Sequence, residues 1–398
     1  MDTFDALPVA GILTNTLKEK NINKPTPVQE ALIPAIYEGK NIIFQSETGT
    51  GKTFAFLLPL ITKIIEEHET LLAEKKQPSP QPRILIIAPT HELCSQIKSQ
   101  AEILCEPLKN SDYKIKPALF IGGSSITRQI ELLKTKPLIL IGGPARILEL
   151  IQLKKLKTDK LTAIVLDEVD RLFSPELRDI TTELLHSVPE EIQVAACSAT
   201  IKDTHAAILE KETGKKLITQ IMPPENVLAG NIKHWVFHAE KRDKIDLLRS
   251  ILNAEKPAKA MVFSAETGQI ANIVSKLQYK KINCAGLHAK TDKAARKKAI
   301  DDFRSGKCPI LVTSDLAARG LDIQGITHII QMDVPDKGNK DFFIHRAGRT
   351  ARAGNEGINI IIGDEYELRA LSRMEKRLGI TIVPKQMYGG EITEPKVF

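Results

Sequence analysis

The sequence predicts an α/β protein built from two similar parallel-sheet domains. Short apolar runs of strand length alternate with longer stretches in which apolar residues recur at helical spacing. Strands that are apolar on both faces and are separated by helices indicate a parallel sheet covered by helices on both sides. The series occurs twice within 398 residues, a length that fits two domains.

The predicted strands form two groups, separated by a segment that suits a short linker. Residues 222–230 contain two prolines and a glycine, which favour a break between compact units. We therefore expect one domain at residues 1–222 and a second at residues 231–398. The strands predicted in the first group are 41–44, 84–88, 138–141, 163–166 and 193–197, and those in the second are 260–263, 283–287, 310–313, 328–332 and 357–361.

Composition restricts the class of protein. The chain is 42% hydrophobic and 26% charged with a net charge of +7, which fits a polyanion partner without demanding one. The five cysteines show neither an even count nor metal-site spacing, so we expect a reducing compartment. The first residues lack the pattern of a targeting peptide, and no apolar run is long enough to span a membrane. We expect a cytoplasmic protein.

A phosphate-binding loop is predicted at residues 46–53, Ser-Glu-Thr-Gly-Thr-Gly-Lys-Thr, between a strand and an apolar helix start. Glycines let backbone N–H groups surround phosphate oxygens, and the helix amino end favours negative charge. Lys52 would reach the β- and γ-phosphates, and Thr53 would bind Mg²⁺. Ser46 stands where the strict pattern has glycine, and the alternative is a turn that binds nothing. The residues predicted to contact the nucleotide here are Thr48, Gly49, Thr50, Gly51, Lys52 and Thr53.

Two acidic residues at the end of predicted strand 163–166 complete this site. Asp167 would hold Mg²⁺, and Glu168 would orient and deprotonate the attacking water. Acidic strand ends are also common helix caps, which is the alternative. Their occurrence in the same predicted domain as Lys52 and Thr53 favours ATP hydrolysis.

The order of short motifs resembles the DEAD-box RNA helicase family over essentially the whole chain. Residues 167–170, Asp-Glu-Val-Asp, resemble the tetrapeptide that names the family, with valine at its third position. Residues 25–29, Pro-Thr-Pro-Val-Gln, resemble the adenine-binding Q motif, with Phe4 as the upstream aromatic residue. Further resemblances lie at 89–93, 122–123, 143–146, 198–200, 262–267, 313–322 and 345–354.

The resemblance implies two tandem RecA-like domains with an ATP site divided between them, and RNA bound across both. Phe4, Gln29 and Asp322 would contact ATP, while Arg349 and Arg352 would join Lys52 and Glu168 as catalytic residues by acting as arginine fingers. The RNA backbone would be contacted by Pro89, Thr90, Gly123, Arg146 and Thr313. Coupling between the domains would involve Asp170, Ser198, Thr200, Arg319 and His345.

Several positions depart from the family pattern without removing a catalytic charge. They bear on RNA contact and on coupling between the domains rather than on hydrolysis. The departing residues are Asn21 and Ile22 in the Q motif, His91, Gly143, Ala289 and Ala351.

We therefore expect a monomeric RNA-dependent ATPase that uses ATP and Mg²⁺ to unwind or remodel RNA duplexes or ribonucleoproteins, with ribosomal or messenger RNA as the target. Two alternatives stay open, a DNA-directed translocase and an RNA-binding assembly factor with little unwinding activity. Lys154, Lys155 and Lys157 fit either a solvated surface or a peripheral RNA contact.

Overall fold

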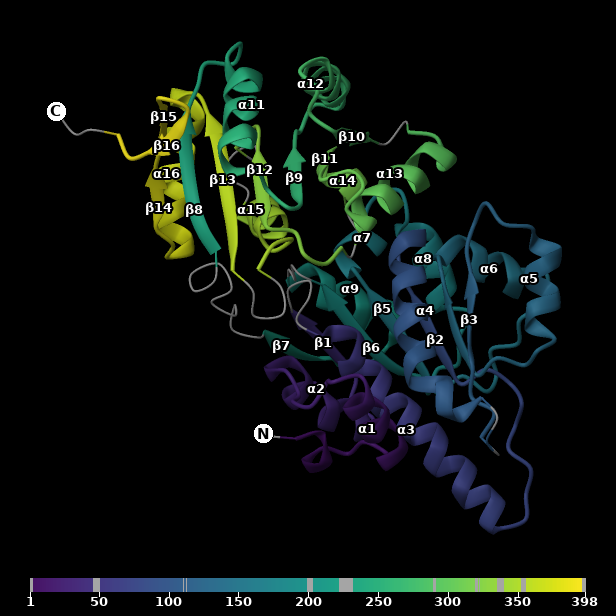
Figure 1. Ribbon diagram of the computed structural model, residues 1–398. Helices are drawn as coiled ribbons and strands as arrows, with labels where there is room; N and C mark the ends of the chain where they lie inside the picture. The colour runs from purple at the N-terminus through teal and green to yellow at the C-terminus, as the bar shows by residue number, and fades with distance from the viewer. Residues whose placement is uncertain are drawn as a thin grey trace. The chain divides into compact units, whose positions relative to one another are not determined.

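A computed structural model describes most of the chain, and within it the protein divides into two compact units, Met1–Pro223 and Pro224–Phe398. Each unit contains one seven-stranded sheet in which all pairs of neighbouring strands are parallel (Figure 1). The predicted α/β class with two similar parallel sheets is thereby confirmed. The described residues are 3–45, 51–109, 111, 113–198, 203–221, 232–288, 291–318, 321, 323–334, 340–351 and 356–395.

The first sheet has the strand order β3-β4-β2-β5-β6-β1-β7. The five central strands agree with the prediction, whereas β3 and β7 were not predicted. These two strands lie at the edges of the sheet, and β3 alternates between buried and half-buried residues instead of being apolar throughout. The strands are β1 (Ile42–Gln45), β2 (Ile84–Ile87), β3 (Pro117–Phe120), β4 (Ile139–Gly142), β5 (Ala163–Asp167), β6 (Gln193–Ser198) and β7 (Ile218–Ile221).

Alternate residues of the central strands enter two different cores, because successive side chains of a strand point to opposite faces. Ile84 and Ile86 pack with α1–α4 on one face, and Leu85 and Ile87 pack with α6–α9 on the other. The helical elements are η1 (Phe4–Ala6), α1 (Gly11–Glu19), α2 (Pro27–Tyr37), α3 (Lys52–Ala73), α4 (His91–Cys105), η2 (Glu106–Leu108), α5 (Ile126–Leu133), α6 (Pro144–Gln152), α7 (Val169–Leu172), α8 (Arg178–Leu185) and α9 (Asp203–Thr213).

The second sheet has the order β10-β11-β9-β12-β13-β8-β14, and a separate antiparallel hairpin, β15–β16, follows it. Strand β14 and the hairpin were not predicted, and each of these strands is only three residues long. The strands are β8 (Ile232–His238), β9 (Ala260–Phe263), β10 (Cys284–Leu287), β11 (Ile310–Thr313), β12 (His328–Gln331), β13 (Gly357–Gly363), β14 (Ile382–Pro384), β15 (Gln386–Tyr388) and β16 (Glu391–Thr393).

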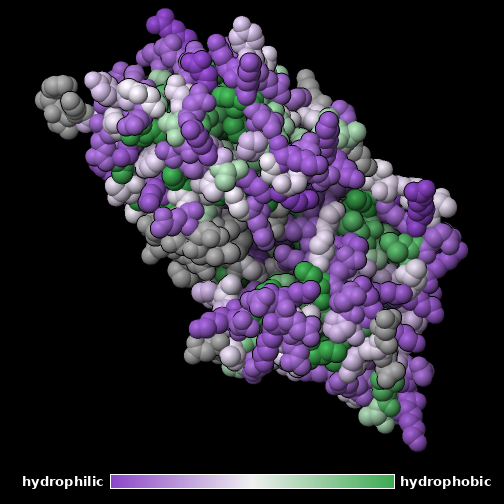
Figure 2. Space-filling view, viewed as in Figure 1, coloured by the Kyte–Doolittle hydropathy of each residue, from purple (hydrophilic) through white to green (hydrophobic). Residues whose placement is uncertain are grey.

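Helices also cover both faces of the second sheet (Figure 1). They are α11 (Lys244–Glu255), α12 (Thr267–Tyr279), α13 (Lys293–Ser305), α14 (Asp315–Ala318), α15 (Lys340–Ala347) and α16 (Glu365–Leu378). Hydrophilic residues cover most of the surface shown in Figure 2. In the part of the chain that the structure describes, no helix combines the length and apolar character needed to cross a membrane.

The parallel direction of the strands decides where the motifs lie. In a parallel sheet all carboxyl ends meet at one edge, and loops there can bring distant residues together. Apart from the Q motif at residues 25–29, which precedes β1, the predicted motifs of the first unit follow the carboxyl ends of β1, β2, β3, β4, β5 and β6. The same edge of the second sheet carries the segments that follow β9 and β11.

Candidate active site

The end of the phosphate-binding loop can be described from Gly51 onward. Gly51 has a φ of 91°, and a Cβ atom there would lie 2.4 Å from Gln29 Nε2, so glycine alone fits. The predicted contacts Thr48, Gly49 and Thr50 lie outside the described residues. Gly51 is the residue immediately before α3, so the predicted phosphate-binding loop ends at the amino end of a helix of 22 residues.

Lys52 is the first residue of α3 and is buried, with 9% of its surface exposed. Among the residues that the structure describes, none accepts a hydrogen bond from its ammonium group or forms an ion pair with it. Buried lysines are ordinarily paired. A buried, unpaired cation beside a helix amino end is suited to a bound anion such as a phosphate group.

Asp167 ends β5 and is also buried. Its Oδ1 atom accepts two hydrogen bonds, from the Glu168 backbone N–H at 2.9 Å and from the Cys197 thiol at 3.1 Å. Within the described chain Oδ2 has no such partner. The carboxylate is therefore held from one side, and its second oxygen can ligate a cation directly or through water.

Glu168 adopts a left-handed backbone conformation with a φ of 55°, which is uncommon for a residue with a side chain. Its Oε2 atom is buried and has no hydrogen-bond partner among the described residues. Burial raises the pKa of Glu168, and the negative charges of Asp167 and Asp170 raise it further, while Lys52 and Arg171 oppose them. The backbone of Glu168 is strained, which is common at functional sites. Its carboxylate, with a raised pKa and an oxygen that has no partner among the described residues, is suited to accept a proton.

Gln29 connects the Q motif to the phosphate-binding loop. Its side-chain oxygen accepts a hydrogen bond from Thr26 N at 2.9 Å, and its Nε2 donates to the Gly51 carbonyl at 3.1 Å. Thr26 caps α2 in return, so the segment has a fixed geometry. Phe4 is 2% exposed and belongs to the core beneath these elements.

Two of the residues that we expect to couple the domains, Asp170 and Ser198, contact each other within the first unit. The Ser198 hydroxyl at the end of β6 donates a hydrogen bond to Asp170 Oδ1 in α7. This bond joins the Asp-Glu-Val-Asp segment to the segment that begins at Ser198. Thr200 lies outside the described residues.

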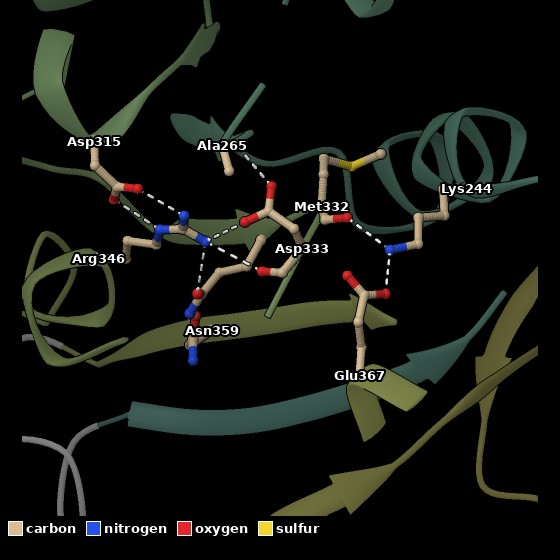
Figure 3. A network of polar contacts seen from close by, with 9 residues as sticks. Lys244, Ala265, Asp315, Met332, Asp333, Arg346, Asn359 and Glu367 are labelled. Atoms are coloured by element: carbon tan, nitrogen blue, oxygen red, sulfur yellow. Dashed lines mark hydrogen bonds and ion pairs between the residues drawn. The ribbon is translucent and has the colours of Figure 1, made fainter. Parts of the chain in front are cut away.

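In the second unit, Arg346 of α15 forms a network that the sequence analysis missed (Figure 3). Its Nε and Nη2 atoms donate to the two carboxylate oxygens of Asp315 at 2.7 Å, and Nη1 contacts Asp333 Oδ1 at 3.0 Å. Asp333 also accepts a hydrogen bond from Ala265 N. Arg346 is 2% exposed, and these carboxylates outweigh the effect of burial and hold its pKa above the usual value.

The network joins three of the predicted motifs, because Ala265 follows β9, Asp315 follows β11 and Arg346 lies in α15. Asp315 and Asp333 each lie two residues after the end of a strand. That position is the signal in the sequence that could have indicated them as partners of a buried arginine.

Arg349 is buried, and its Nη1 donates to the Leu321 carbonyl at 2.8 Å. Arg319, Asp322 and Arg352 lie outside the described residues, and His345 is placed in α15 without a described side chain.

Comparisons with known proteins decide the family. Residues 26–208 match the DEAD/DEAH box helicase family model, and residues 243–354 match that of the helicase conserved C-terminal domain. A DEAD-box ATP-dependent RNA helicase of Bacillus cereus, CshC, is 35% identical over 93% of this chain and 90% of its own length. The chain belongs to the DEAD-box helicase family. A second Bacillus cereus member, CshB, is 32% identical over 98% of this chain and 86% of that protein.

The fold agrees with this membership. The structure of S. cerevisiae Dbp5 bound to RNA and ADP BeF3 is similar, with a TM-score of 0.80, 25% identity and 96% of both chains covered. The two sheets of this DEAD-box protein are thus tandem RecA-like domains.

Three of the residues that we expect to contact RNA take part in local hydrogen bonds. Thr90 caps α4 by accepting a hydrogen bond from Leu93 N at 3.3 Å. Arg146 donates to the Ser124 carbonyl at 3.1 Å and pairs with Glu149 at 2.9 Å, which places it beside the Gly123 turn. Pro89 precedes Thr90 after β2. In the second unit, Thr313 is fully buried, and its hydroxyl donates to the Ser314 carbonyl.

Of the departures outside the Q motif, three lie in the part of the chain that the structure describes. His91 begins α4, and its ring lies 3.5 Å from the position of a Cβ atom on Gly122. Gly143 caps α6 without a side-chain bond, and a Cβ atom there would meet nothing closer than 4.0 Å. Ala351 has a φ of 55°, where glycine is favoured, and is 5% exposed. Ala289 lies outside the described residues.

Proposed function

We propose that this DEAD-box protein is an RNA-dependent ATPase that locally unwinds or remodels RNA duplexes or ribonucleoproteins. ATP-driven closure of two domains, residues 1–222 and 231–398, would supply the motion. The observation that carries the proposal is the occurrence in one domain of a buried lysine, Lys52, and a glutamate with a buried Oε2 atom, Glu168, neither of which has a partner for that group among the described residues. Family membership supplies the reaction class.

The residues present fit ATP with Mg²⁺. Asp167 offers its Oδ2 atom, which accepts no hydrogen bond from any residue that the structure describes, and Thr53 offers a hydroxyl group. Oxygen donors are those that Mg²⁺ prefers. When bound, Mg²⁺ would neutralise charge on the transferred phosphate. Lys52 would hold the phosphates together with Thr48, Gly49, Thr50 and Gly51, and Glu168 would take the proton of the attacking water.

At the adenosine end of the nucleotide, Gln29 and Phe4 would contact the adenine, and Asp322 would contact the ribose. Arg349 and Arg352 would supply positive charge to the transferred phosphate when the domains close. Such arginines contribute roughly 10³–10⁵ in rate. Because both belong to the second unit and Lys52 to the first, closure would be required for turnover.

RNA would be bound through its sugar–phosphate backbone, with little sequence specificity. The residues that we assign to this contact are Pro89, Thr90, Gly123, Arg146 and Thr313. Closure would be coupled to hydrolysis through Asp170, Ser198, Thr200, Arg319 and His345, and the Asp-Glu-Val-Asp segment would replace the usual family tetrapeptide. We further propose a cytoplasmic monomer that acts on ribosomal or messenger ribonucleoproteins.

The decisive test is ATP turnover with and without RNA. We expect RNA to stimulate turnover of the wild-type protein, and we expect Lys52→Ala to abolish it. Turnover that is indifferent to RNA in folded protein would contradict the proposal, and equal stimulation by DNA of the same sequence would instead support a DNA-directed translocase.

A further inference from the structure

A group of lysines lies at the edge of the first sheet opposite to the candidate active site. The motifs described above follow the carboxyl ends of the strands, whereas these lysines lie in the segments that precede β3, β4 and β5. We call this group the basic edge. It consists of Lys114, Lys116, Lys134, Lys136, Lys154, Lys155, Lys157 and Lys160.

The segments before β3 and β4 are adjacent, and the segment before β5 is separated from them by the one strand β2, in the order β3-β4-β2-β5. Backbone hydrogen bonds continue beyond the strand ends, from Ile139 N to the Lys116 carbonyl and from Thr162 N to the Arg83 carbonyl. With about 4.8 Å between neighbouring strands, the lysines gather across roughly 15 Å at the sheet. These lysines therefore belong to one edge of the sheet.

Few acidic residues lie within these three segments. Seven of the lysines are exposed, Lys116 being half-buried. Lys134 pairs with Glu131, but the other lysines form no ion pair among the residues that the structure describes. Asp159 is the one acidic residue in segments 113–116, 134–138 and 153–162. At physiological ionic strength such charges repel one another within about 8 Å, and a polyanion relieves that repulsion.

Three of these lysines also occupy backbone positions where glycine is favoured. Lys114, Lys136 and Lys154 have φ values of 50°, 56° and 56°. At the end of α6, Lys154 N bonds the Ile151 carbonyl and Lys155 N bonds the Leu150 carbonyl, which is the helix-ending arrangement that usually contains glycine.

We propose that the basic edge is a second RNA-binding surface, which contacts the phosphate backbone of a segment flanking the one held at the carboxyl ends of the strands. This inference rests on the proposed RNA-dependent function and extends it to longer substrates. RNA is favoured over an anionic membrane because Leu153 is the one large apolar side chain exposed in the described residues of these three segments. Binding at a membrane surface requires an apolar face.

The test is equilibrium binding of a 40-nucleotide and an 8-nucleotide RNA over a range of KCl concentrations. The test variant replaces Lys154, Lys155, Lys157 and Lys160 with glutamine. The control replaces four scattered exposed lysines with glutamine, Lys20, Lys211, Lys276 and Lys376, and so changes the net charge equally. We expect the test variant alone to bind the long RNA roughly tenfold more weakly, with a salt slope reduced by about 3.

Equal long-RNA affinity for test and control variants would overturn the proposal, as would loss of the 8-nucleotide complex to the same degree as the long one. Selective loss of binding to anionic lipid vesicles, with RNA binding retained, would assign the surface to membranes instead. None of these outcomes depends on ATP turnover, so failure of this inference is distinct from failure of the proposed function.

A second variant separates charge from backbone conformation. Lys154→Gly is expected to raise the Tm, because glycine adopts the left-handed conformation without strain, while weakening binding of the long RNA. Lys256→Gly, at a similar left-handed position after α11 in the second unit, is expected to raise the Tm with long-RNA binding unchanged. Identical RNA binding in the two glycine variants would contradict the proposal.

Discussion

The Cys197 thiol donates a hydrogen bond to Asp167 Oδ1 at 3.1 Å, between the neighbouring strands β6 and β5. Both side chains are buried. The bond fixes the carboxylate that we assign to Mg²⁺, and it occupies the oxygen that already accepts the Glu168 backbone N–H. In the part of the chain that the structure describes, Oδ2 accepts no hydrogen bond, and we propose that this oxygen binds the metal.

Replacing Cys197 should therefore change how well the protein binds Mg²⁺ together with nucleotide. We expect Cys197→Ala to raise the Mg²⁺ concentration needed for half-maximal binding of a fluorescent ADP by about fivefold, since one hydrogen bond contributes about 1 kcal/mol. Cys197→Ser keeps a donor of similar size and serves as the control. Equal Mg²⁺ dependence in the alanine and serine variants would show that the thiol does not position Asp167.

Glu168→Gln is expected to lower ATP turnover by roughly 10²–10⁴, the usual contribution of general acid–base catalysis.

The effect of Glu168→Gln on the stability of the protein should depend on pH. The raised pKa of Glu168 means that ionisation costs stability, a cost absent below the ordinary carboxyl pKa and fully present above the raised pKa. Glutamine removes that cost, so the variant should have a higher Tm than wild type at pH 8 but not at pH 4. A Tm difference that does not change between these pH values would contradict the raised pKa.

The network around Arg346 should stabilise the second unit. Arg346→Lys keeps the charge but cannot bond both oxygens of Asp315 in parallel, and weakening a buried ion pair of this kind costs up to about 3–5 kcal/mol. Trp235, the single tryptophan of the chain, lies in β8 of the same unit, so its fluorescence can follow unfolding in urea. The exposed pair Arg369–Glu365 provides the control, since Arg369→Lys should change stability by less than about 1 kcal/mol.

Ala351 tests the backbone conformation that follows α15. A β-branched residue is poorly compatible with a φ of 55°, so Ala351→Val should destabilise the second unit by more than about 1 kcal/mol. Ala351→Gly should stay within about 1 kcal/mol of wild type, because relief of strain offsets the loss of a buried methyl group. Urea unfolding followed through Trp235 distinguishes the two. A valine variant as stable as wild type would show that the turn carries no strain.

The sequence allowed the central strands to be predicted because they are apolar on both faces and are separated by helical periodicity. The edge strands β3, β7 and β14 escaped prediction because an edge strand is short or only partly apolar. Such strands form because their backbones hydrogen-bond to a neighbouring strand, and the sequence does not show which strands become neighbours.

The same reason explains what could be predicted of the site. Lys52 and Glu168 were predicted because each motif lies within a few consecutive residues. The contact of Gln29 with Gly51 and the network of Arg346 join residues far apart in the chain, so they become visible only once the sheet brings them together. The basic edge is a similar case, since the strand order alone brings its three segments to the same part of the sheet edge.

The central claim is that the chemistry is divided between the two units and requires their closure. The native cysteines described in the structure are buried, so dyes can be attached to cysteines introduced at the exposed residues Ser99 in α4 and Tyr279 in α12. In the Glu168→Gln protein, single-molecule energy transfer between these dyes should show a new distance only when ATP and RNA are both present. An unchanged distance with both ligands, at concentrations where each is shown to bind, would contradict the divided site.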